Sequence, residues 1–214
     1  MDPTVKKIVY QVLAGVFGIV LIAVGVGALF GANFAHGYVD TQLSQERITM
    51  PGEPAMGSVS PESAEILEQF WGDPMTTGPQ AQAYANNFIY DHMLNACADV
   101  TDANGNPVDP VPPEQCTYAG IGGAVTAATD AGDENAAEAY QALRTSNFQG
   151  SALRSMLLTA YAFWLVGAIA QWVGIAAIVV GVLLLVLRFT VLRGEADPVS
   201  VDANRAPEAT PRTA

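Results

Sequence analysis

Two long apolar runs dominate the pattern of hydrophobic and polar positions along the chain. The first, residues 8–30, contains no charge, and Gln11 is its only strongly polar side chain. The second, residues 156–187, also contains no charge, and its strongly polar side chains are Thr159 and Gln171. About 20 apolar residues are enough for a helix to cross a bilayer, so each run predicts a transmembrane helix. Because the second run is longer than this, we expect its helix to protrude from the membrane.

The segment between the two runs has the pattern of short helices separated by proline and glycine breaks. Residues 33–48 lack proline and predict an extension of the first helix, ending before Pro51. Ser60 followed by Pro61 predicts a helix start, because a hydroxyl caps the first turn and proline suits its first position. We expect this helix to run to about Phe70.

The clearest amphipathic pattern of the middle segment begins after Thr77, where apolar side chains recur at spacings of three and four up to about Cys97. Residues 134–145 also predict a helix, because they are rich in strong helix formers. Residues 117–129 predict only weak helix, since they contain three glycines, and residues 148–150 (Phe-Gln-Gly) predict a break. No segment alternates with period two, so the middle domain is predicted to be all-α.

Basic residues orient the two predicted spans. Lys6 and Lys7 precede the first run, and Arg188 and Arg193 follow the second. Because positive charges remain on the cytoplasmic side, we expect a plasma-membrane protein with both termini in the cytoplasm. A cleaved signal peptide is an alternative for the first run, with residues 35–37 (Ala-His-Gly) as a weak cleavage site. Its apolar region exceeds the usual length of 7 to 15 residues, which favours an uncleaved signal anchor.

Composition and charge support this division of the chain. Half of the residues are hydrophobic and 14% are charged, which is typical of membrane proteins. Residues 34–153 carry 16 acids and two basic residues, so this domain is not expected to bind nucleic acid. We expect an all-α membrane protein, composed of a cytoplasmic N-terminus (1–7), transmembrane helix 1 (8–30), an acidic extracytoplasmic helical domain (31–155), an outer helix extension with transmembrane helix 2 (156–187) and a disordered cytoplasmic tail (188–214).

Small residues recur every seven positions in both apolar runs. A spacing of seven keeps one side of a helix facing a partner, and small side chains let two backbones approach each other within lipid. The pattern predicts that the two spans pack antiparallel, with a helix of another protein as the alternative partner. The predicted packing residues are Gly18, Gly25, Ala32, Gly167, Gly174 and Gly181.

Cys97 and Cys116 are the two cysteines of the chain. On the outer side of a membrane they meet an oxidising compartment, so we expect them to form a disulfide. The loop between them carries Asp99, Asp102 and Asp109, which are candidate cation ligands. Their spacing does not fit an EF-hand, because counting from Asp102 places a proline where the sixth position requires glycine. Two cysteines without a neighbouring histidine are also too few for a zinc site.

The sequence contains no motif that indicates catalysis. The two histidines, His36 and His92, belong to no metal-binding or hydrolytic pattern, and no nucleophile stands out. We therefore expect no catalytic residue, no cofactor and no resident metal. The leading hypothesis is a non-enzymatic accessory or scaffold subunit of a cell-envelope complex, with a membrane-protein partner or a second copy of itself. The alternative is an extracytoplasmic module that binds or senses a cation or small ligand.

Several stretches resemble a group of two-span actinobacterial envelope membrane proteins of unknown function with an extracytoplasmic helical domain. They are YVDTQLSQERITMPG, TTGPQAQAYANNFIYDHML, the Cys-Thr-Tyr-Ala that begins at Cys116, and LRSMLLTAYAFWLVGAIAQWVGI. The resemblance covers roughly residues 5–190 and implies the two-span topology. Its motifs carry no chemistry. It also implies that the cysteine loop is an insertion on a common frame.

Overall fold

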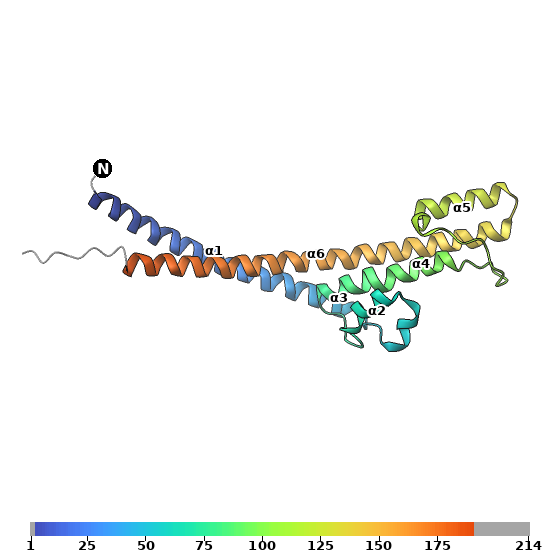
Figure 1. The fold of residues 1–214 in the computed structure, drawn as a ribbon, viewed down its shortest axis with the longest axis horizontal. Helices are drawn as coiled ribbons and strands as arrows, with labels where there is room; N and C mark the ends of the chain where they lie inside the picture. Colours follow the sequence, from blue (N-terminus) through green and yellow to red (C-terminus); the bar gives the residue numbers. More distant parts are fainter. Residues whose placement is uncertain (1–2, 191–214) are drawn as a thin grey trace, which may run out of the picture. The chain divides into compact units, whose positions relative to one another are not determined.

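The structure is a computed structural model that describes residues 3–190, and its regular elements are helices (Figure 1). Within these residues there is no strand, and only two isolated bridges, Thr49 with Pro74 and Thr101 with Pro107, pair extended backbone. The all-α prediction is therefore confirmed. In chain order the helices are α1 (Pro3–Glu46), the 3₁₀-helix η1 (Glu53–Ser58), α2 (Pro61–Glu68), α3 (Gly78–Ala83), the π-helix η2 (Tyr84–Ile89), α4 (Tyr90–Ala98), the 3₁₀-helix η3 (Pro113–Gln115), α5 (Tyr118–Asp130) and α6 (Glu134–Thr190).

The two predicted apolar helices are present in α1 and α6. Both are long and apolar enough to cross a membrane, and within their most apolar stretches only 17% and 11% of the residues, respectively, are buried. Large apolar side chains are exposed on both, including Phe30 at 75% and Trp172 at 72%. The disordered tail was predicted from residue 188, whereas α6 continues to Thr190. The rest of the predicted tail lies outside the described residues.

The chain divides into two compact units. The terminal unit consists of the described parts of Met1–Ala23 and Ala177–Ala214, and the central unit of Val24–Ala176. In the terminal unit, α1 and α6 touch at Gly18 and Gly181. A Cβ at Gly18 would lie 2.9 Å from the carbonyl oxygen of Gly181, and one at Gly181 would lie 2.7 Å from that of Gly18. Only glycine permits this approach.

In the central unit the same two helices meet at two further glycines. A Cβ at Gly174 would lie 2.8 Å from the carbonyl oxygen of Gly25, and one at Gly167 would lie 2.9 Å from the Cβ of Ala35. All six predicted packing residues are buried. Towards its C-terminal end α1 buries larger side chains, Val39 and Leu43, on this side.

One apolar core of the central unit lies where α1 ends and α2 to α4 begin. It contains Leu43, Met50, Leu67, Met75 and Leu157, among others. Extended segments beside α1 are held by the backbone hydrogen bonds that Met50 donates to Asp73 and Met75 donates to Ile48. The core therefore joins the end of α1 to the middle of α6.

Two predicted helix starts around this core are confirmed. The hydroxyl of Ser60 accepts a hydrogen bond from the amide of Ser63, with Pro61 at the first helical position of α2. Thr77 and Gln80 form a reciprocal capping box at the start of α3, in which the side chain of each residue accepts a hydrogen bond from the backbone amide of the other. These caps satisfy amides that the first helical turns leave without partners.

A second apolar core surrounds the cysteines at the other end of the central unit. Cys97, Cys116, Ile121, Tyr140 and Leu143 belong to it, so it joins α4, α5 and the first turns of α6 (Figure 1). Residues 117–129 were predicted to be only weakly helical, whereas residues 118–130 form the regular helix α5. Thr117 caps this helix by accepting from the amide of Gly120, and Ile121 is fully buried. Packing and capping thus outweigh the low helix propensity of the three glycines.

The predicted break at residues 148–150 is wrong, because α6 passes through it without interruption. A Cβ at Gly150 would lie 2.9 Å from the Sδ of Met93 on α4. Glycine in a helix costs about 1 kcal/mol relative to alanine, and here it permits close packing of two helices. Gly150 is therefore a packing residue and not a hinge.

Candidate functional site

The cysteine loop is held at both ends by the disulfide between Cys97 and Cys116, whose Cα atoms are 6.0 Å apart. Both residues are buried, Cys97 near the end of α4 and Cys116 just before α5. Backbone hydrogen bonds close the loop further, with Val108 donating to Val100 and Val111 donating to the carbonyl of Cys97. The disulfide and these hydrogen bonds consequently hold the loop against the second core.

The carboxylate of Asp102 is used within its own turn. One of its oxygens accepts from the amides of Asn104 and Asn106 at 2.9 and 2.8 Å, and the other accepts from the side chain of Asn106 at 2.9 Å. Gly105 has a φ of +83°, a conformation that glycine adopts readily. The side-chain amide of Asn106, followed by its backbone amide, lowers the pKa of Asp102. This carboxylate therefore organises the turn.

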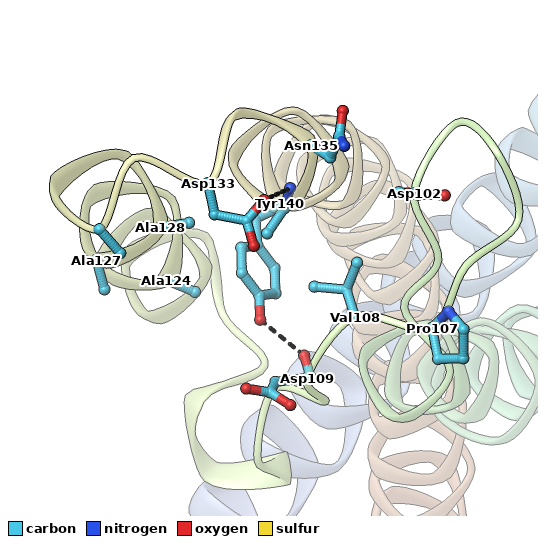
Figure 2. Close-up of a pocket in the computed structure, with 12 residues that line it drawn as sticks. Asp102, Pro107, Val108, Asp109, Ala124, Ala127, Ala128, Asp133, Asn135 and Tyr140 are labelled. Atoms are coloured by element: carbon cyan, nitrogen blue, oxygen red, sulfur yellow. Dashed lines mark hydrogen bonds between the residues drawn. The ribbon is translucent and has the colours of Figure 1, made fainter.

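A pocket of about 580 Å³ lies between the cysteine loop, α5 and the start of α6 (Figure 2). Asp102, Asp109 and Asp133 line it together with several small alanine side chains of α5 and α6. Asp133 also caps α6, because its Oδ1 accepts from the amide of Ala136 at 3.0 Å. The pocket is thus lined by both carboxylates and small apolar side chains.

Tyr140 lies in this pocket, and Figure 2 shows its hydroxyl directed to the loop. The hydroxyl donates to the backbone carbonyl of Asp109 at 2.8 Å. Burial raises the pKa of Tyr140 above its usual value, and the carboxylates of Asp109 and Asp133 raise it further. Because this hydrogen bond uses the backbone carbonyl of Asp109, it leaves the Asp109 carboxylate as a negative charge beside the pocket.

The three candidate cation ligands are not brought together as one set. Asp102 and Asp109 line the pocket, whereas Asp99 ends α4 as an exposed residue that does not line it. Within residues 3–190, no group of three histidine, cysteine, aspartate or glutamate residues is placed to hold a metal ion.

A second groove, of about 360 Å³, lies between α4 and α6 and is mainly apolar. Asn147 lines it and is only 3% exposed. Its Oδ1 has no hydrogen-bond partner, and its amide group donates only to the Sγ of Cys116 at 3.5 Å. Buried amides are rarely left in this state. Asn147 therefore both lines this groove and contacts the disulfide.

The π-helix η2 lies opposite α6 at Arg154. The guanidinium donates from Nε to the carbonyl of Ala85 and from a terminal nitrogen to the Oδ1 of Asn86, each at 3.0 Å. It also lies over the ring of Tyr90 at 4.6 Å. A π-segment disturbs the normal pairing of helix carbonyls, and Arg154 supplies a donor to one of them. The sequence pattern predicted a helix here but gave no sign that these residues would form a π-helix.

Both histidines make contacts typical of packing. His36 stacks on Trp164 with ring centroids 4.9 Å apart, and its Nε2 lies 3.2 Å from the carbonyl oxygen of that residue. His92 lies with Nδ1 2.7 Å from the carbonyl of Phe88 and Nε2 3.3 Å from the Oγ of Ser58. The hydroxyl of Ser58 in turn donates to the backbone carbonyl of Ala55 at 2.6 Å.

No protein-family model matches the chain, and the searches of curated proteins and of solved structures also found no match. The site residues must therefore be interpreted from their own geometry. Sequence reasoning identified the loop and its acids. It missed Tyr140, Asn147 and Arg154, which become notable only when α4, α5 and α6 are packed together.

Proposed function

We propose that the chain is an integral plasma-membrane protein with two spans, a cytoplasmic N- and C-terminus and an acidic extracytoplasmic domain. In this proposal it is a non-enzymatic accessory or scaffold subunit of a cell-envelope complex. The observation that carries the proposal is the exposed apolar surface of α1 and α6, on which Phe17, Phe30, Trp172 and Leu183 are 58%, 75%, 72% and 60% exposed. Such a surface in water would cause aggregation, whereas lipid or a partner helix covers it at no cost.

The glycine contacts support the same proposal. In each unit they involve one side of each helix, with Gly18 against Gly181 in the terminal unit and Gly25 against Gly174 in the central unit, and large apolar side chains elsewhere on the helices remain exposed. Pairing through small residues is typical of helices that associate within lipid, where no hydrophobic drive brings them together. The remaining apolar surface is then available to lipid or to a membrane-protein partner.

Membrane insertion and topology are tested in intact cells. The chain should remain in the membrane fraction after alkaline carbonate extraction. An exposed cysteine introduced by Asn135→Cys should react with a membrane-impermeant thiol reagent from outside, and one introduced by Thr210→Cys should react only after lysis. Extraction into the soluble fraction, or labelling of Thr210→Cys from outside, would contradict the proposal.

The role as a subunit is tested after solubilisation in mild detergent. We expect the chain to be purified in a fixed stoichiometry with a membrane protein or with a second copy of itself, measured by native mass spectrometry. A chain that is monomeric under every mild condition would show that it does not act as a scaffold subunit.

A second candidate function is the binding of a small organic cation by the acidic pocket. It rests on the three carboxylates, Asp102, Asp109 and Asp133, that line the pocket together with alanine side chains. An alkylammonium ion should raise the melting temperature, and Asp109→Asn should abolish this rise. Asp99→Asn is the matched control, because Asp99 is acidic and nearby but does not line the pocket. Equal effects of the two variants would indicate diffuse charge attraction only.

A further inference from the structure

In the terminal unit, the described residues of α1 and α6 carry positive charges and no negative charge. The whole chain has a formal charge of −12, yet residues 3–23 and 177–190 contain Lys6, Lys7 and Arg188 and no acid. Arg188 is half-buried, so its charge lies against the protein and not free in solvent. A partly buried guanidinium without a carboxylate among the described residues of its unit is suited to an external anion.

The backbone of Gly15 provides the space for this guanidinium. A Cβ at position 15 would collide with a terminal nitrogen of Arg188, so the guanidinium lies directly on α1. Its carbon is also 5.6 Å from the ring centroid of Phe189. The group is thus held at the junction of the two helices, where its planar set of donors can be presented in a fixed orientation.

An apolar groove lies beside this charge. It has a volume of about 370 Å³ and is lined on α1 and α6 only by apolar and aromatic residues, namely Tyr10, Leu13, Ala14, Phe17, Leu184 and Leu187. Ala14 is adjacent to Gly15, and Leu187 is adjacent to Arg188. An extended apolar chain in the groove would therefore end close to the guanidinium.

We propose that this junction binds one anionic phospholipid, with its phosphate on Arg188 and one acyl chain in the groove. The inference rests on the proposed insertion of both helices into a membrane. Guanidinium and phosphate match in charge and in geometry, because the two can form paired parallel hydrogen bonds. The proposed orientation places this end in the cytoplasmic leaflet, which carries the anionic lipids. Zwitterionic lipid fills the groove equally well but places a positive group near Arg188.

The central unit contains an internal control. A groove of about 330 Å³ on α1 is lined by Val26, Leu29, Phe30 and Asn33, so it is similar in size and mainly apolar. No lysine or arginine occurs in α1 between Ile8 and Glu46. Lipid held there should show no preference for a negative headgroup.

The test is native mass spectrometry of the full chain in neutral detergent with equal amounts of phosphatidylglycerol and phosphatidylcholine. The wild type should retain phosphatidylglycerol preferentially, and Arg188→Gln should reduce this preference about fivefold, which corresponds to about 1 kcal/mol. Ala14→Phe, which fills the groove, should reduce retention of phosphatidylglycerol. Val26→Phe should leave it unchanged. Melting temperatures of the variants identify any that fail to fold.

Lys6→Gln separates a site from general attraction by positive charge. If the preference depends on the Arg188 site, Lys6→Gln should have a much smaller effect than Arg188→Gln. Equal losses in the two variants, or a wild type without preference, would overturn the proposal. Carbonate extraction of the same samples separates this failure from that of the proposed function. If the chain stays in the membrane but shows no lipid preference, only the proposed lipid site is contradicted. If the chain is extracted, both the lipid site and the proposed membrane insertion are contradicted.

Discussion

Gly174 on α6 lies so close to Gly25 on α1 that a Cβ at position 174 would be 2.8 Å from the carbonyl oxygen of Gly25. Gly174→Ala should therefore push the helices apart and lower the free energy of unfolding by about 1–3 kcal/mol, as overpacking does elsewhere. Gly27→Ala is the matched control, because Gly27 is in the same helix as Gly25 and has no neighbour within 4 Å. It should be neutral or slightly stabilising, since alanine favours helix. Unfolding in detergent, followed by circular dichroism, measures both; equal effects would show that the contact does not hold the helices.

The disulfide should stabilise the outer helices. Replacing Cys97 and Cys116 together by serine should lower the free energy of unfolding by about 3 kcal/mol, on the chain-entropy estimate for a loop of this length. The loss should be greatest in α4 and α5, whose ends the disulfide joins. Peptide mapping without reduction should recover the two cysteines as one linked pair. Recovery of two free thiols from cells would contradict both the disulfide and the proposed location of the domain.

Tyr140 should make the protein sensitive to alkaline pH. Burial and the two nearby carboxylates hold its pKa above the unfolded value, so the folded state favours the neutral phenol. The associated stability is complete below the unfolded pKa, near 10, and is lost as the pH rises through the folded pKa. Tyr140→Phe should flatten the decline of melting temperature between pH 9 and 11. Some slope should remain, because burial also raises the pKa of Tyr84.

At neutral pH the same variant should be less stable than the wild type by about 0.5–1.5 kcal/mol. The reason is the loss of the hydrogen bond from the Tyr140 hydroxyl to the carbonyl of Asp109. An unchanged alkaline slope in Tyr140→Phe would show that other groups cause the decline.

Asp102→Ala should loosen the cysteine loop whether or not calcium is present. The amides of Asn104 and Asn106 lose their acceptor, so their hydrogen exchange should become faster. In the wild type the carboxylate has a lowered pKa, so its contribution is present above the unfolded pKa and is lost as the pH falls through the folded one. Asp99→Ala is the control, because exchange at Asn104 and Asn106 should not change. Calcium-dependent protection in the wild type would contradict a purely internal role of Asp102.

Local chemistry explains how much of the fold could be predicted from the sequence. Ser60 and Pro61 act on amides within one turn, so their pattern identified a helix start directly, and the apolar spacing after Thr77 identified another. The apolar runs were equally clear, because a helix long enough to cross a membrane is encoded in consecutive residues. The seven-residue spacing also indicated which sides of α1 and α6 touch.

The errors have a different physical cause. Gly150 was expected to break a helix, because its low propensity is visible in the sequence while the contact with Met93, 57 positions earlier, is not. The pocket around Tyr140 likewise requires α5 and α6 to meet the cysteine loop. Distant packing decides these features, and propensity alone gives no information on it.

The uninterrupted course of α6 past Gly150 fixes a rotational phase within the central unit. Gly150 faces Met93 and Gly174 faces Gly25; a Cβ at position 174 would meet backbone, and one at position 150 would require the Met93 side chain to move. One residue inserted between these glycines would turn everything beyond it by about 100° and break one contact or the other. An insertion of seven residues nearly restores the phase, although it displaces the outer helices along the axis. The spacing between Gly150 and Gly174 is thus fixed by the two contacts, and a single inserted residue would disrupt it.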